Sequence, residues 1–290
     1  MQTIKEARKY QYNYHSEKFP YVDDWKRNPY TFLKARFYME ASAILVYLLL
    51  KTKIKPNTVT IIYGLAGIVG GILLSIPLKV TIILALIIFS TKGILDWSDG
   101  HLARVTGQAS VTGHVLDVYG AYLNDLGLQI GLGFYVAFKT GSHGFYYLIP
   151  LIPFFFAAKL KTFSETVLFT ELSKKKFLES RMQGYADASR IHTTSENVKT
   201  NVLGKYKKYY EYFSAILDAR ARNVDFICLL ILFEMFTSVS ITWIIFIAFV
   251  IKGFISFVGG YYITIKKCWV EKSVDAVIYN MRNALKGDDE

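Results

Sequence analysis

The stretch TVTIIYGLAGIVGGILLSIPLKVTIILALIIFSTKGIL, residues 58–95, decides the fold class of this chain. It holds two apolar runs, residues 58–76 and 80–95, which are separated by three residues that include Pro77. A helix needs about 17 to 25 mainly apolar residues to cross a bilayer, and each run comes close to or falls within that length. The stretch therefore predicts a helical hairpin in a membrane.

Four more apolar runs follow, and together the six predict an all-α polytopic membrane protein. We expect the other spans at residues 115–138, 145–158, 224–236 and 241–263. The fourth and fifth of the six spans are short and are expected to extend through tilted, amphipathic ends. Residues 30–51 carry charged side chains beside an apolar face, which predicts an interfacial amphipathic helix before the first span.

These spans divide the chain into five predicted regions. They are a cytoplasmic N-terminus with the interfacial helix (1–55), spans one to four (56–170), a basic cytoplasmic amphipathic insertion (171–223), spans five and six (224–266) and a cytoplasmic tail (267–290). The insertion is polar and basic, so we expect two or three helices on the membrane surface and no second globular domain.

The formal net charge of +11 is concentrated in three regions, namely the N-terminal stretch to Lys55, residues 174–222 and the tail after Lys266. A nucleic-acid binder can share such a charge, but basic loops of a membrane protein explain charge and hydropathy together. The connections at 77–79, 139–143 and 237–240 hold two lysines and no arginine. The positive-inside rule therefore places both termini on the cytoplasmic side, with anionic lipids and not nucleic acid as partners.

The apolar runs are interrupted by DWSDGHLARVTGQASVTGHVLDVYGAYLND, residues 96–125. Ionisable residues inside a membrane are costly and usually face a protein interior or a watery cavity where they have a function. Asp96 and Asp99 are three residues apart and share one side of a helix, and Asp117 opens the next span. Two neighbouring helices can therefore direct three carboxylates into one cleft on the cytoplasmic side.

Three converging carboxylates repel one another unless a cation lies between them. Hard divalent ions such as Mg²⁺, Mn²⁺ or Ca²⁺ prefer oxygen ligands, whereas His101 and His114 have no zinc-like spacing. The planar guanidinium of Arg104 is suited to a phosphate, and the small residues Gly100 and Ala103 allow a close approach to the backbone. These features together indicate phosphoryl chemistry.

This motif resembles the signature of the CDP-alcohol phosphotransferase (phosphatidyltransferase) family. The matching positions are Asp96, Asp99, Gly100, Ala103, Arg104, Gly113 and Asp117, at the family's spacing. The string KPNTVT, residues 55–60, is similar to the family's Pro-Asn-x-x-Thr element, and the layout of six spans is also similar. The resemblance does not extend to the first thirty residues or to residues 171–223.

The family cleaves the pyrophosphate of a CDP-linked donor, transfers a phosphoryl-bearing group to an alcohol and releases CMP. The resemblance implies a site of the two-metal kind for Mg²⁺ or Mn²⁺, with Asp96, Asp99 and Asp117 as ligands. It implies that the nucleotide is held by Asn57, Thr60, Gly100, Ala103, Arg104 and Gly113. The expected donor is CDP-diacylglycerol or a CDP-linked head group, the acceptor is an alcohol, and the protein is expected to be a homodimer.

The family pattern also has a fourth Asp, four residues after Asp117, which binds a metal and deprotonates the acceptor hydroxyl. Here that catalytic position is Ala121, which can do neither. Asp125 lies one further turn along, about 6 Å in rise and rotated by some 40°, and reaches the site only if the helix shifts. Two interpretations stay open: this chain is a laboratory variant made to keep substrates bound, or it is a natural homologue with lost or altered chemistry.

Two other function classes compete with an active transferase. A catalytically inactive homologue would only bind a CDP-linked nucleotide. An ion-coupled membrane transporter would line its ion path with the three acids, but these cluster toward one membrane face and the chain shows no half-repeat.

Several residues have a second interpretation. The basic segment 174–222 is expected to face lipid head groups, or else to hold an acceptor phosphate through Arg220 and Arg222. Asn57 and Thr60 are either ligand contacts or helix caps and packing groups. Glycines of the first span are expected to serve helix packing, namely Gly64, Gly67, Gly70 and Gly71.

Overall fold

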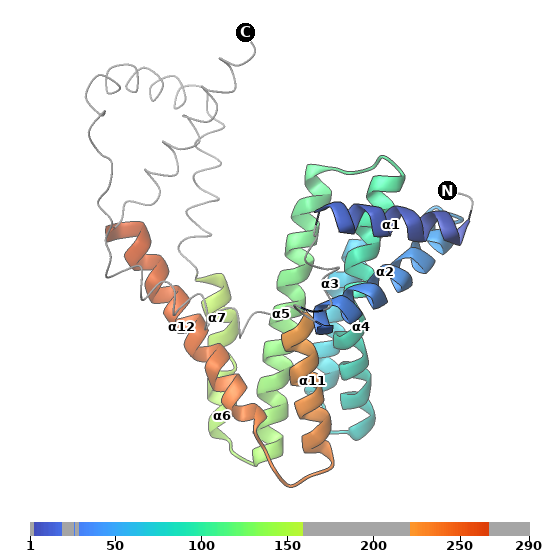
Figure 1. Ribbon diagram of the computed structural model, residues 1–290. Coiled ribbons are helices and arrows are strands. Elements are labelled where there is room, and N and C mark those ends of the chain that lie inside the picture. Colours follow the sequence, from blue (N-terminus) through green and yellow to red (C-terminus); the bar gives the residue numbers. More distant parts are fainter. Residues whose placement is uncertain (1–2, 19–25, 27–28, 159–220, 267–290) are drawn as a thin grey trace, which may run out of the picture. The chain divides into compact units, whose positions relative to one another are not determined.

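The computed structural model describes residues 3–18, 26, 29–158 and 221–266, and all regular elements in these parts are helices (Figure 1). The predicted all-α class is therefore confirmed. The predicted tail, 267–290, and the predicted insertion up to residue 220 lie outside the described residues. The helices are α1 (Ile4–Lys18), α2 (Pro29–Leu49), α3 (Pro56–Leu74), α4 (Lys79–Val105), α5 (Val111–Thr140), α6 (Gly144–Leu148), α7 (Leu151–Ala157), α11 (Ala221–Met235) and α12 (Thr242–Lys266).

Three helices in the described part of the chain are long and apolar enough to cross a membrane by length and composition. They are Pro56–Leu74, Lys79–Val105 and Thr242–Tyr262, which correspond to the predicted first, second and sixth spans. The predicted third and fifth spans form the helices α5 and α11, and the fourth is divided between α6 and α7. For these three segments, and for α2 as an interfacial helix, the membrane assignment stays a prediction.

The chain divides into two compact units. The first is formed by Met1–Ile152 and Ile216–Phe249, and the second by Pro153–Ala215 and Val250–Glu290. In the first unit α3 packs against α4 and α5, α2 packs against α4, and α11 packs against α2 and α4. In the second unit the ring of Phe155 packs against those of Phe254 and Phe257, with centroids 6.1 and 5.9 Å apart.

The contact between α3 and α5 is made of glycines, which confirms the predicted packing role of the first-span glycines. A Cβ atom on Gly131 would lie 2.7 Å from the carbonyl oxygen of Gly71, and one on Gly64 would lie 3.3 Å from the Cα of Gly120. A Cβ atom on Gly127 would overlap the carbonyl group of Gly67. The absence of side chains thus lets the two helix backbones touch, as small residues commonly do between membrane helices.

Gly127→Ala is expected to destabilise the protein by about 1–3 kcal/mol, because the added methyl group meets rigid backbone. Thermal unfolding in detergent, followed by loss of the monodisperse peak, measures this effect as a lower midpoint temperature. Gly259→Ala in α12 is the matched control, since no atom of the described residues lies within 4 Å of its added Cβ atom. It is expected to leave the midpoint unchanged or to raise it through better helix propensity. An equal midpoint for both variants would contradict the glycine contact.

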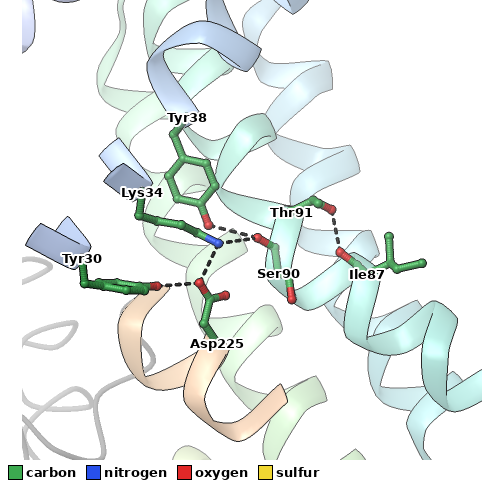
Figure 2. Close-up of polar contacts among 7 residues, drawn as sticks. All are labelled: Tyr30, Lys34, Tyr38, Ile87, Ser90, Thr91 and Asp225. Atoms are coloured by element: carbon green, nitrogen blue, oxygen red, sulfur yellow. Dashed lines mark hydrogen bonds and ion pairs between the residues drawn. The ribbon is translucent and has the colours of Figure 1, made fainter. Parts of the chain in front are cut away.

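A polar cluster fixes α2 to α4 and α11 (Figure 2). The Lys34 ammonium forms an ion pair with Asp225 at 2.7 Å and donates to the Ser90 carbonyl oxygen at 3.0 Å. The Tyr30 hydroxyl donates to the same Asp225 oxygen at 2.5 Å, and the Tyr38 hydroxyl donates to the Ser90 carbonyl at 3.2 Å. The Lys34 side chain is only 16% exposed. This charged residue of the predicted interfacial helix therefore makes its ion pair inside the protein.

The turn between α11 and α12 buries a second charged group, Glu234, completely. Its carboxylate accepts hydrogen bonds from the backbone N–H of Ile241 and from the N–H and hydroxyl of Thr242, the latter two at 2.7 and 2.8 Å. Because the first N–H groups of a helix have no partner within the helix, Glu234 caps the N-terminus of α12. An acid within the predicted fifth span therefore has a structural role.

Candidate functional site

A cavity of ≈ 200 Å³ lies where α4 ends and α3 and α5 begin. All six residues that the resemblance assigns to the nucleotide line it, together with two of the three predicted metal ligands, Asp99 and Asp117. The full lining is Pro56, Asn57, Thr60, Asp99, Gly100, Ala103, Arg104, Gln108, Ala109, Ser110, Gly113, His114 and Asp117. The fold thus brings residues that are up to 61 positions apart in the sequence, from Pro56 to Asp117, to the wall of one cavity.

The helix geometry around this cavity favours an anion. Pro56 and Asn57 at the start of α3 line it, as do Ser110 and Gly113 at the start of α5, so the N-termini of two long helices meet there. A helix N-terminus carries a partial positive charge and free N–H groups, which bind phosphate. Ser110 is the N-cap of α5, and its hydroxyl oxygen accepts a hydrogen bond from the N–H of Gly113 at 3.0 Å. The N-cap of α3 is Lys55, so the cap alternative for Asn57 is wrong.

Two glycines leave room at the wall of the cavity. A Cβ atom on Gly100 would lie 3.1 Å from Nη1 of Arg104. A Cβ atom on Gly113 would lie 3.3 Å from Oδ1 of Asn57. Gly107, in the turn between α4 and α5, has a φ of 66°, which a residue with a side chain adopts only at a cost. This turn lets the two halves of the motif face each other.

The acids of the motif lie close to one another. Asp99 is buried, lines the cavity, and its Oδ2 atom has no hydrogen-bond partner within the described part of the chain. Its carboxylate interacts electrostatically with Asp117 and Arg104. Asp96 does not line the cavity, but it interacts with Asp99, Asp117 and Lys92. The three predicted ligands therefore form one negatively charged group within α4 and α5.

The three acids do not form a complete set of metal ligands in this structure. Within the described ranges, no set of three or more His, Cys, Asp or Glu side chains is placed so that it could hold a metal ion. The chemistry of the group nevertheless suits a hard divalent cation, because its donors are carboxylate oxygens and one of them, Oδ2 of Asp99, is buried without a partner. The metal site stays a prediction.

The sequence did not single out Tyr63 of α3, which belongs to the same group. Its side chain lies near four acids. Asn124 of α5 is fully buried and its amide nitrogen donates to the carbonyl of Tyr63 at 2.9 Å, which holds α3 against α5 at this level. The four acids are Asp96, Asp99, Asp117 and Asp125.

The position of the missing acid is exposed. Ala121 lies one turn after Asp117 on α5, is exposed and does not line the cavity. Asp125 lies near Lys92 and Tyr63. Of the two acceptor candidates, Arg220 falls outside the described residues, and Arg222 is in the first turn of α11, with its side chain outside them.

Comparison with known proteins agrees with the motif. Residues 53–166 match the family model described as CDP-alcohol phosphatidyltransferase. This range contains α3, α4 and α5 and with them every residue that lines the cavity. A search of curated proteins finds no match. Residues 53–166 thus resemble the CDP-alcohol phosphatidyltransferase family, and the long apolar helices in the described part of the chain mark it as an integral membrane protein.

Proposed function

We propose that the cavity binds the cytidine diphosphate portion of a CDP-alcohol and that the chain is built to transfer the attached phosphoryl-linked group to an alcohol acceptor. The observation that carries this proposal is the meeting of Arg104, two helix N-termini and two acids in one cavity. In the reaction the acceptor oxygen forms a bond to the donor's phosphorus, the pyrophosphate P–O bond breaks, and CMP leaves with the electron pair. The hydroxyl proton must pass to a base.

The basic groups of the cavity would hold the diphosphate. The Arg104 guanidinium presents a planar set of donors that matches phosphate oxygens, and the N–H groups at the starts of α3 and α5 add partial positive charge. The glycines Gly100 and Gly113 let the ligand approach the backbone. These groups would stabilise the charge that develops on the departing CMP.

The acids Asp96, Asp99 and Asp117 would hold Mg²⁺ or Mn²⁺ through their carboxylate oxygens. When bound, such ions supply charge neutralisation for the pyrophosphate. The unpartnered Oδ2 of Asp99 supports this role, since a buried carboxylate oxygen without a hydrogen bond is costly unless a cation offsets it. Lys92 lies beside Asp96.

A second cavity supports a substrate that carries acyl chains. It measures ≈ 490 Å³ and is lined by apolar side chains of α4 and α11 and by five polar residues, Tyr30, Lys34, Ser90, Thr91 and Asp225. Its apolar lining residues include Leu86, Ile87, Leu229 and Leu232. Of the two donor classes, this favours CDP-diacylglycerol.

We also expect that both termini and the active site lie on the cytoplasmic side of the membrane. The basic segment is expected to contact anionic lipids, and the protein is expected to form a homodimer.

A catalytically inactive CDP-binding protein is the second candidate, and the observation that favours it is Ala121. With no acid at this position, the site lacks the group that the family uses to deprotonate the acceptor. Both candidates bind CMP or CDP with the help of Mg²⁺ or Mn²⁺, which an ion-coupled transporter does not. Turnover after the acid is restored separates the two.

The experiment that tests the proposed function uses the Ala121→Asp protein with radiolabelled CDP donors and a pool of alcohols. We expect release of CMP together with one labelled phosphodiester product, whose identity gives the acceptor. Formation of no product from any donor, while CMP still binds, would establish the inactive binding protein.

A further inference from the structure

The N-terminal helix α1 lies outside the family-matching residues, yet it contacts the segment of α4 that carries the motif. In Figure 1, α1 runs crosswise to α4 and α5. The rings of Tyr10 and His101 are stacked with centroids 5.4 Å apart, and those of His15 and Trp97 with centroids 4.1 Å apart. His101 and Trp97 are four residues apart and share one face of α4, so α1 covers that face.

The same face of α4 ends with Arg104, which α1 also contacts. The guanidinium carbon of Arg104 lies 3.7 Å from the centroid of the Tyr14 ring, and Nη2 donates to Oε1 of Gln11 at 3.5 Å. Gln11 is fully buried, and its Nε2 donates to the Ser42 hydroxyl of α2 at 3.3 Å. This second bond fixes the Gln11 amide so that its oxygen faces Arg104.

These contacts engage Nη2 and the ring-facing side of the guanidinium and leave Nη1 for a ligand. Nη1 lies against Gly100, whereas Nε is buried and has no hydrogen-bond partner among the described residues. Arg104 also lines the cavity of the candidate site. The Tyr14 ring lies against the face of the guanidinium group, whereas a phosphate binds to its edge. Arg104 can therefore contact Tyr14 and a phosphate at the same time.

We infer that α1 is part of the active site, with Tyr14 and Gln11 as positioning residues that hold Arg104 ready for the diphosphate. An arginine side chain is flexible, and a fixed aromatic platform reduces the freedom that it loses on binding. The inference rests on the proposed function, because it needs Arg104 to bind the nucleotide. It adds a part of the site that lies before residue 53 and that the family motif does not contain.

The test measures the Kd of CMP in the presence of Mn²⁺ for the full chain in detergent. Tyr14→Leu, which keeps an apolar side chain but removes the ring, and Tyr14→Ala are both expected to weaken CMP binding by about fivefold to tenfold. Tyr14→Phe keeps the ring and is expected to bind CMP as the unchanged protein does. In a chain that already carries Arg104→Ala, Tyr14→Leu is expected to have no further effect, since it acts through Arg104.

Tyr12→Ala is the matched control on the same helix. The guanidinium carbon of Arg36 lies 4.6 Å from the centroid of the Tyr12 ring, so this variant removes a similar cation–π contact away from the cavity. It is expected to leave CMP binding unchanged. If Arg104→Ala weakens CMP binding but neither Tyr14 variant does, or if these variants bind CMP more tightly, the inference is wrong and the proposed function stands. If the unchanged protein does not bind CMP, the proposed function fails and the inference fails with it.

Discussion

Ala121→Asp is expected to raise the rate of CMP release from a CDP-alcohol by about 10²- to 10⁴-fold, the usual contribution of a well-placed general base. Position 121 lies one helical turn after Asp117, so a carboxylate there lies on the same side of α5 as Asp117. Because Ala121 is exposed, the added carboxylate does not have to fit into a packed core. The rate is measured as labelled CMP released in the presence of Mg²⁺ and an alcohol acceptor.

Ala121→Asn is the control for this gain, because it has nearly the same shape as Asp but cannot accept the proton at neutral pH. It is expected to stay at the rate of the unchanged protein. Asp125→Asn in the unchanged chain tests the other base candidate, which lies near Lys92 and Tyr63. If Ala121→Asp gives no increase, and Asp125→Asn removes whatever activity is present, then position 121 is not the base position.

Asp99→Asn is expected to weaken Mn²⁺-dependent CMP binding by more than about 100-fold, since loss of a direct metal ligand costs more than loss of an outer-shell partner. Without metal, the same variant is expected to be as thermally stable as the unchanged protein or more stable. The reason is that Asp99 is buried with an unpartnered Oδ2 atom, and the amide removes this uncompensated charge.

Thermal unfolding with and without Mn²⁺ and CMP measures both effects at once. The unchanged protein should be stabilised by the ligands, and Asp99→Asn should lose that stabilisation. Glu40→Gln is the control carboxylate, because Glu40 is exposed and pairs with Arg8 at 2.6 Å outside the cavity. Equal stabilisation of Asp99→Asn and Glu40→Gln would exclude Asp99 as a metal ligand.

The lining of the candidate site was predictable because its residues are close in the sequence. The motif from Asp96 to Asp117 occupies two helices joined by a short turn, so helical periodicity alone brings its acids together. Residues of the KPNTVT element line the same cavity because α3 begins beside this turn. The family resemblance predicted this position, whereas the spacing of the residues alone did not. Apolar length likewise predicted the spans α3, α4 and α12.

The contacts of α1 were not predictable in the same way. The helix has a polar and aromatic sequence, and of its buried residues Ala7, Gln11 and His15 only Ala7 is apolar, so they give no apolar stripe. Its position depends on stacking with Trp97 and His101, about ninety residues away in the chain. Such long-range side-chain pairing leaves no periodic signal in the sequence.

Charged residues in predicted spans also had roles that the sequence could not assign. Asp225 and Glu234 both fall in the fifth predicted span, but neither contributes to the candidate metal group. Asp225 neutralises Lys34 of α2, and Glu234 caps α12. A charge in an apolar run therefore indicates a partner, and only the fold shows whether that partner is a ligand or another helix.

The most direct test of the account is the anomalous scattering of Mn²⁺ in crystals of the protein grown with MnCl₂ and CMP. The account predicts anomalous density between the carboxylates of Asp96, Asp99 and Asp117, next to the nucleotide phosphate beside Arg104. Density elsewhere, or none at these carboxylates while CMP occupies the cavity, would contradict it.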